Sequence, residues 1–203
     1  MSVLIGCEFS GVVREAFRAR GIDAVSCDLL PSEIPGSHIQ DDILKHMGDG
    51  WDGFIGHPPC THTAVSGARW FKDKLPEQKK AIEFFMALWN SPIPRVALEQ
   101  PVSIMSTVFR PPDQIIQPWM FGDAETKATC LWIRGWPILR PTNIVPEAER
   151  KHSVWLTPPG PDRWRIRSKT FEGIANAMAD QWGTSLRTEP LLTSYMEVNQ
   201  PSV

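Results

Sequence analysis

The chain has little of several features that would define a function class at once. Its four cysteines include no Cys-x-x-Cys pair, which argues against a disulfide scaffold and against a paired zinc site. Its 21 basic and 23 acidic residues give a net charge of −2, which excludes a strongly basic nucleic-acid coat but not a local basic groove. No apolar run approaches ~18 residues, so no segment is expected to span a membrane. The chain begins in an apolar stretch with no basic segment before it, so we expect no signal peptide and a cytoplasmic protein.

Short apolar runs instead alternate with amphipathic segments. Strands are predicted at residues 2–7, 24–28, 39–43, 51–56, 94–98 and 129–133, and helices at residues 12–20, 76–90 and 170–182. This alternation predicts an α/β fold with a doubly wound, mostly parallel sheet in a single domain. The domain is expected to cover residues 1–183, followed by a flexible tail at residues 184–203. Residues 61–75 are predicted to form a mobile loop, and residues 102–122 to be irregular.

Glycine or acidic residues follow the first three predicted strands. Gly11, in the segment Phe9-Ser10-Gly11, lets backbone N–H groups at the start of a helix approach a ligand. Asp28 ends the second strand, where doubly wound folds place an acid on ribose hydroxyls, although a turn or helix-capping acid is an equal alternative. Asp42 lies near the end of the third strand. Together these positions predict a nucleoside-binding pocket at one edge of the sheet.

The segment His57-Pro-Pro-Cys60 follows the fourth predicted strand. Two prolines hold the thiol of Cys60 on a stiff backbone, which suits a nucleophile. The alternative is a buried, inert thiol, which the polar residues after Cys60 make less attractive. A metal site is not expected, because His57, Cys60 and His62 lie close together but no second ligand pair follows.

In their order along the chain, these motifs resemble those of the DNA (cytosine-5) methyltransferases. The matching segments are Phe9-x-Gly11, Asp28, Asp42-Ile43, Pro59-Cys60 and Glu99-Gln-Pro101, within residues 3–135. More narrowly, the chain is similar to short phage and prophage members of that superfamily, for which the compartment would be the host cytoplasm. The resemblance implies a Rossmann-like methyltransferase fold, S-adenosylmethionine as the cofactor and DNA as the partner.

The resemblance also implies roles for individual residues. Cys60 would add to C6 of a cytosine, Glu99 would hold the N3 and amine edge of the base, and Lys127 would lie near the base. The implied cofactor-binding residues are Phe9, Ser10, Gly11, Asp28, Leu29, Asp42, Ile43 and Pro58.

Three departures from the family pattern bear on specificity. Where the family has Gln-x-Arg-x-Arg, this chain has residues 125–129, in which Lys127 cannot supply the planar, bidentate contact of an arginine. Gln100 follows Glu99 where the family has asparagine. The short insert at about residues 136–169 leaves no room for a target recognition domain, so little or relaxed sequence specificity is expected.

Two stretches combine cations with tryptophan, which suits contacts to a nucleic-acid backbone and stacking on bases. The candidate nucleic-acid-binding residues are Arg69, Trp70, Arg163, Trp164, Arg165, Arg167 and Lys169. The alternative for the second stretch is a solvated loop or an edge strand with its tryptophan in the core. For the first it is a loop anchored by its aromatic side chains.

The leading hypothesis is methyl transfer from S-adenosylmethionine to C5 of cytosine in DNA, through a covalent bond between Cys60 and C6. A second hypothesis is modification of a free pyrimidine nucleotide, or transfer of a group other than methyl. Thymidylate-synthase-like chemistry is less favoured, because those enzymes lack the strand-end acids upstream. A third hypothesis is a non-catalytic relative that binds DNA or a protein partner. No feature of the sequence indicates an oligomeric state.

Overall fold

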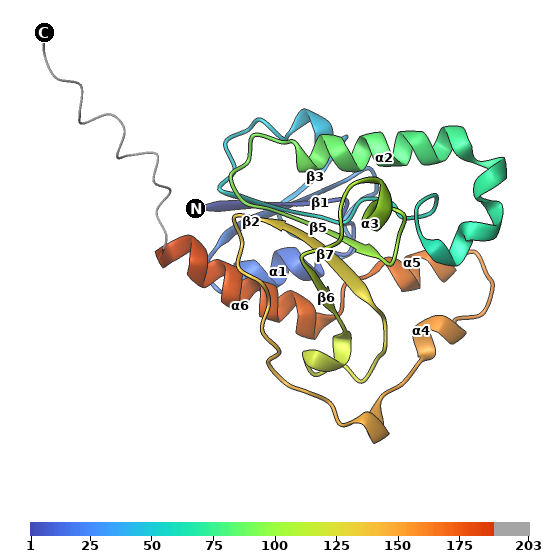
Figure 1. Cartoon of the computed structure of the whole chain (residues 1–203). Coiled ribbons are helices and arrows are strands. Elements are labelled where there is room, and N and C mark those ends of the chain that lie inside the picture. Colours follow the sequence, from blue (N-terminus) through green and yellow to red (C-terminus); the bar gives the residue numbers. More distant parts are fainter. Residues whose placement is uncertain (189–203) are drawn as a thin grey trace, which may run out of the picture.

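The computed structural model describes residues 1–188 of the chain (Figure 1). The strands are β1 (Ser2–Gly6), β2 (Asp23–Asp28), β3 (His38–Gln40), β4 (Gly53–Gly56), β5 (Val96–Pro101), β6 (Gln114–Ile116) and β7 (Thr129–Arg134). The α-helices are α1 (Val12–Arg18), α2 (Leu75–Trp89), α3 (Met105–Val108), α4 (Ser153–Leu156), α5 (Arg163–Ser168) and α6 (Glu172–Thr188). The 3-10 helices are η1 (Ile43–Lys45), η2 (Val65–Asp73), η3 (Pro118–Met120) and η4 (Glu147–Glu149).

The strands form a single sheet with the order β3-β2-β1-β4-β5-β7-β6. Strands β1 to β5 pair in parallel, and β7 runs antiparallel to both β5 and β6. This arrangement confirms the prediction of a doubly wound, mostly parallel sheet in a Rossmann-like α/β domain. The chain builds outward from β1 to β3, then returns to β4 on the other side of β1. Such a reversal creates the crevice where doubly wound folds bind ligands.

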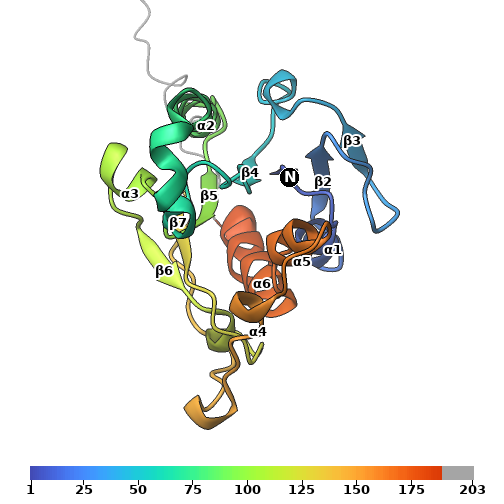
Figure 2. The ribbon, with the colours of Figure 1, turned by 90° about the vertical axis from the view of Figure 1, so that its right-hand side faces the viewer.

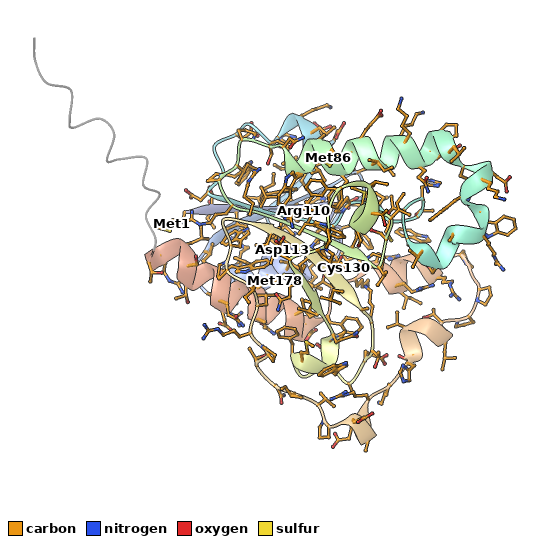
Figure 3. The ribbon with its side chains drawn as sticks, viewed as in Figure 1. Met1, Met86, Arg110, Asp113, Cys130 and Met178 are labelled. Atoms are coloured by element: carbon orange, nitrogen blue, oxygen red, sulfur yellow. The ribbon has the colours of Figure 1, made fainter. Side chains whose placement is uncertain are left out.

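Helices cover both faces of the sheet. In Figure 3, Met86 on α2 lies on one side of the sheet, Met178 on α6 lies on the other, and Cys130 of β7 lies between them. Alternation along the strands supplies both cores, because successive side chains of a strand point to opposite faces. Val3 and Ile5 of β1 pack with α1 and α6, whereas Leu4 packs with α2. The sheet is therefore apolar on both faces, as the continuous apolar runs predict.

Several segments are more regular than the sequence indicates. Residues 61–75, predicted to be a mobile loop, contain η2, and the predicted irregular region 102–122 contains α3, β6 and η3. The third strand is shorter than predicted, ending at Gln40 before the chain turns into η1. The final helix runs to Thr188, so the prediction that the tail begins at residue 184 is wrong for its first residues. The rest of that predicted tail lies outside the described residues.

The carboxyl ends of the parallel strands face one side of the molecule. Figure 2 looks onto that side, where η2 and α5 lie nearest the viewer. The two segments are far apart in the sequence, yet both lie at the end of the sheet where the predicted site residues emerge. No helix within residues 1–188 is long and apolar enough to cross a membrane.

Candidate functional site

A cleft of about 750 Å³ opens at the carboxyl ends of β1, β2, β4 and β5. The predicted site residues that line it are Phe9, Asp28, Pro58, Cys60, Arg69, Trp70, Glu99, Lys127, Arg163, Trp164 and Arg167. The three residues expected to carry the chemistry therefore share one cavity with two of those expected to hold the ribose and adenine of a cofactor. This gathering follows from the parallel sheet, because strands running the same way end at the same edge.

The start of α1 is occupied by a side chain of the protein itself. The Glu8 carboxylate accepts hydrogen bonds from the backbone N–H of Val13 (2.6 Å) and from the hydroxyl of Ser10 (3.2 Å). Gly11 caps the helix in the left-handed conformation, with φ of 77°. Burial raises the pKa of Glu8. The expectation that these N–H groups face a ligand is therefore wrong for Val13, and neither Ser10 nor Gly11 lines the cleft.

The end of β2 contributes its acid to the cleft but not the residue after it. Asp28 lines the cleft, and burial raises the pKa of its carboxyl group, which also accepts a hydrogen bond from the N–H of Leu30 (2.9 Å). The Leu29 side chain is 72% exposed and lies outside the cleft, and Leu30 lines the wall in its place. Asp28 stabilises a tight turn here, and because of this turn the apolar residue that lines the cleft is Leu30 and not Leu29.

The side chains of Asp42 and Ile43 are engaged elsewhere. Asp42 caps η1, accepting the N–H of Leu44 at 3.0 Å. Ile43 is buried in the core beside Gly6. Both placements follow from the early end of β3, which turns the chain into η1 before these residues reach the cleft. A contact from Ile43 to a bound nucleoside would have to come from its backbone.

The loop that carries Cys60 is held by the residue after Glu99. The buried side chain of Gln100 donates from Nε2 to the carbonyl oxygen of Pro58 (3.3 Å) and accepts from the hydroxyl of Thr63 (3.1 Å). These bonds attach both ends of the loop to β5 and fix the direction of Cys60. The Gln100 side chain thus positions the loop that carries Cys60.

A hydrogen bond joins the ends of β4 and β5. His57 Nδ1 lies 3.3 Å from Glu99 Oε2. The register pairs Gly56 with Leu98, so the next residues along the chain, His57 and Glu99, also come to lie side by side. A carboxylate can only accept, so Nδ1 carries the proton of this bond. Burial opposes the charged form of Glu99, but the hydrogen bond from His57 and the charge of Lys127 outweigh it and lower the pKa of Glu99. Glu99 is therefore ionised near neutral pH.

Opposing charges act on the thiol of Cys60. Burial raises its pKa, and the negative charge of Glu99 raises it further, whereas Lys127 and Arg167 lower it. The net pKa lies above the usual thiol value, so Cys60 is mostly protonated at neutral pH in the free protein. The Lys127 ammonium is held in place by the carbonyl oxygen of Arg167, to which it donates at 3.0 Å.

We expect Lys127→Met to slow alkylation of Cys60 by iodoacetamide about three- to tenfold between pH 7 and 9. Removing the cation raises the pKa of Cys60, so the thiolate fraction at any pH below that pKa falls. In the unmodified protein, the alkylation rate should still be increasing when the pH reaches the usual pKa of a thiol, because the pKa of Cys60 lies above that value. Mass spectrometry of the labelled peptide gives the rate. Lys72→Met, a change to an exposed lysine of η2, is the matched control, and equal rates in both variants would contradict the prediction.

Basic and aromatic side chains from two segments face each other at the mouth of the cleft. On η2, the Arg69 guanidinium lies 5.1 Å from the centre of the exposed Trp70 ring. Arg163 and Arg167 line the opposite side from α5. The segment that contains Trp164 forms the helix α5, so it is neither a loop nor an edge strand. Its role in binding nucleic acid remains a prediction.

Two of the predicted nucleic-acid-binding cations are paired within the protein. Arg165 and Lys169 both contact the Glu33 carboxylate, at 2.5 and 2.6 Å. Glu33 belongs to the segment after β2, so the pairs join that segment to α5. These two cations have less positive charge to offer a phosphate backbone than the sequence pattern suggests.

Several residues of the site were not identified from the sequence. They are Cys7, Glu8, Leu30 and His57, and the positioning residue Gln100. Cys7 has a positive φ of 57°, and burial raises the pKa of its thiol well above that of an ordinary cysteine. Their common signal is adjacency, because each lies within two residues of a residue that was identified. Within residues 1–188, no three His, Cys, Asp or Glu side chains are grouped so as to hold a metal ion.

No protein-family model matches the chain, and no curated protein matches it. Among solved structures, the chain is similar to that of DNMT2 from Spodoptera frugiperda carrying three substitutions, with a TM-score of 0.44 and 13% sequence identity. The alignment covers 71% of this chain and 54% of that chain, so this protein spans about half the length of the DNMT2 chain.

Proposed function

We propose that this protein transfers a methyl group from S-adenosylmethionine to C5 of cytosine in DNA, with little or relaxed sequence specificity. The observation that carries the proposal is the shared cleft, which is lined by Cys60, Glu99 and Lys127 and also by Phe9 and Asp28. Asp28 ends β2 and Glu99 lies in β5, and β1 and β4 separate these strands, so the two groups belong to opposite ends of the cleft. A nucleophile, an acid for the base edge and a nucleoside pocket in one cavity suit a two-substrate transfer to a pyrimidine.

The residues of the cofactor end suit S-adenosylmethionine. Phe9 offers an aromatic surface to adenine and Asp28 an acceptor to ribose hydroxyls. The carboxylates of Asp28 and Glu99 favour a ligand with a positive charge, which the sulfonium carries. When bound, the cofactor supplies an electrophilic methyl group.

Each residue at the cytosine end has a distinct task. The Cys60 thiolate bonds to C6, which makes C5 electron-rich. The ionised Glu99 accepts from the exocyclic amine and stabilises a proton on N3 as the ring takes up electrons. C5 would then take up the methyl group, with S-adenosylhomocysteine as the leaving group. Loss of the C5 proton to water would restore the C5–C6 double bond and expel the Cys60 thiolate. Lys127 and Arg167 lower the pKa of Cys60, so they favour both its attack and its departure.

The direct test supplies tritium-labelled S-adenosylmethionine with duplex DNA, single-stranded DNA or dCTP. We expect label in DNA, recovered as 5-methylcytosine in many sequence contexts after digestion and mass spectrometry. Label in dCTP alone would replace the DNA substrate by a free nucleotide, and a modified base of another mass would replace the methyl group. Folded protein that labels none of the three substrates would contradict the proposal and favour a non-catalytic binding protein.

A further inference from the structure

A smaller cavity of about 220 Å³ adjoins the cleft at its Asp28 end. It is lined by Phe9, Leu30, Pro31, Asp162, Trp164 and Arg165. Phe9, Leu30 and Trp164 also line the large cleft, so the two cavities are neighbours that share these three residues. Its walls combine two aromatic rings with two aliphatic side chains, and a carboxylate and a guanidinium lie at its edge.

The two rings are in contact but not stacked. The Phe9 and Trp164 ring centroids lie 5.7 Å apart, with 55° between the planes. Phe9 is 8% exposed, whereas Trp164 remains 55% exposed although it contacts that ring. Trp164 therefore has much apolar surface open to water beside an apolar floor. A flat aromatic ligand entering here would cover that surface and gain stacking contacts.

A single residue, Glu33, connects the floor of this cavity to its cover. The backbone N–H of Glu33 donates to the carbonyl oxygen of Phe9 at 2.8 Å, and the Glu33 side chain holds Arg165 and Lys169. The segment around Glu33 is itself anchored by the buried guanidinium of Arg14, which donates to the Ile34 carbonyl oxygen at 2.6 Å. The position of α5 over Phe9 is thus set by contacts within the protein.

We propose that α5 is the cover of the cofactor's purine site, with Trp164 stacking on a purine that rests against Phe9, Leu30 and Pro31. This inference rests on the proposed function and deepens it. It moves Trp164, Arg165 and Lys169 from the nucleic-acid surface to the cofactor site. Asp28 lies in the adjoining cleft, where it can take the ribose that such a purine carries. Arg163 and Arg167 remain on the cytosine side.

The test compares two tryptophans that both line the cleft and are similarly exposed. Calorimetry measures the binding of S-adenosylhomocysteine and of adenosine to the unmodified protein, Trp164→Leu, Trp164→Phe and Trp70→Leu. We expect Trp164→Leu to weaken binding of both ligands about tenfold, because a base–aromatic stacking contact is lost. Trp164→Phe should recover most of that loss, and Trp70→Leu should leave binding unchanged. Affinity for a DNA duplex, measured at saturating S-adenosylhomocysteine, should not change in Trp164→Leu.

A second variant tests the tie from Glu33. Glu33→Gln keeps the size of the side chain but removes the charge that holds α5, so S-adenosylhomocysteine should bind about threefold more weakly. Binding of S-adenosylhomocysteine should also depend less on salt concentration in Glu33→Gln than in the unmodified protein, because ion pairs are screened by salt. Glu83→Gln, which neutralises an exposed pair with Lys79 on α2, is the control.

The possible failures are distinct. If S-adenosylhomocysteine binds the unmodified protein and Trp164→Leu equally well, the role of α5 as a cover is overturned and the proposed function stands. If Trp164→Leu instead weakens DNA binding alone, α5 belongs to the nucleic-acid surface. If the folded, unmodified protein binds neither S-adenosylhomocysteine nor adenosine, the proposed function fails together with the role of α5.

Discussion

Cys60→Ser is expected to abolish the covalent adduct with DNA carrying 5-fluorocytosine, and to lower methyl transfer by at least about a thousandfold. Fluorine at C5 cannot leave as a proton does, so the bond between sulfur and C6 persists and the complex survives denaturation. A serine hydroxyl is a far weaker nucleophile than a thiolate, because it stays protonated near neutral pH. A denaturing gel and peptide mass spectrometry measure the adduct and its position.

The control for this experiment is the other cysteine of the cleft. Cys7 lines the cavity at its cofactor end, but burial and the charge of Asp28 raise the pKa of its thiol. Cys7→Ser should therefore keep the adduct. Cys60→Ser should keep its affinity for S-adenosylhomocysteine, which shows that the pocket is intact. An adduct that survives Cys60→Ser, or that maps to Cys7, would show that the nucleophile is not Cys60.

The gathering of Cys60 and Glu99 could be predicted from the sequence because it needs only strand direction. Two apolar runs that pair in parallel must end at the same edge, whatever the loops between them do. The contact of His57 with Glu99 could not be predicted, because it depends on register. A shift of one residue between Gly56 and Leu98 would send the two side chains to opposite faces.

Periodicity also fails where another segment covers the outer face of a helix. In α1 the apolar spacing places Arg14 among the polar positions, but its guanidinium is fully buried. It donates to the hydroxyl of Ser26 in β2 and to the hydroxyl of Ser32 in the segment that follows β2. A long-range anchor of this kind leaves no local signal. The ion pairs of Arg165 and Lys169 could not be predicted for the same reason, since their partner Glu33 is distant in the sequence.

The end of α6 shows how a glycine can suggest a false boundary. Gly183 follows Trp182 and indicates a helix end, yet the helix continues and buries Leu186. A Cβ at position 183 would lie 2.3 Å from the Cδ1 methyl of Ile22, so the glycine lets α6 pack closely against the turn after α1 without displacing that methyl group. The sequence shows that a glycine is present but not which neighbour approaches it.

Glu99→Gln is expected to change methyl transfer and thiol reactivity in opposite directions. Methyl transfer should fall about a hundredfold or more, mostly in kcat, because a neutral amide cannot stabilise a proton on N3 as a carboxylate does. The negative charge of Glu99 raises the pKa of Cys60, so its removal lowers that pKa and increases the thiolate fraction below it. Alkylation of Cys60 by iodoacetamide should therefore become about three- to tenfold faster near pH 8.

These opposed effects separate a chemical role of Glu99 from a structural one. In Glu99→Gln, the amide oxygen of the new side chain can still accept the proton of His57 Nδ1, so the joint between β4 and β5 is retained. A variant that merely loosened the cleft would lower methyl transfer without a specific gain at Cys60, and it would weaken S-adenosylhomocysteine binding as well. Slower alkylation in Glu99→Gln would mean that the negative charge of Glu99 does not raise the pKa of the Cys60 thiol. Faster alkylation with unchanged methyl transfer would remove Glu99 from the chemistry, and leave Lys127, Arg163 and Arg167 as charged candidates for contacting the base.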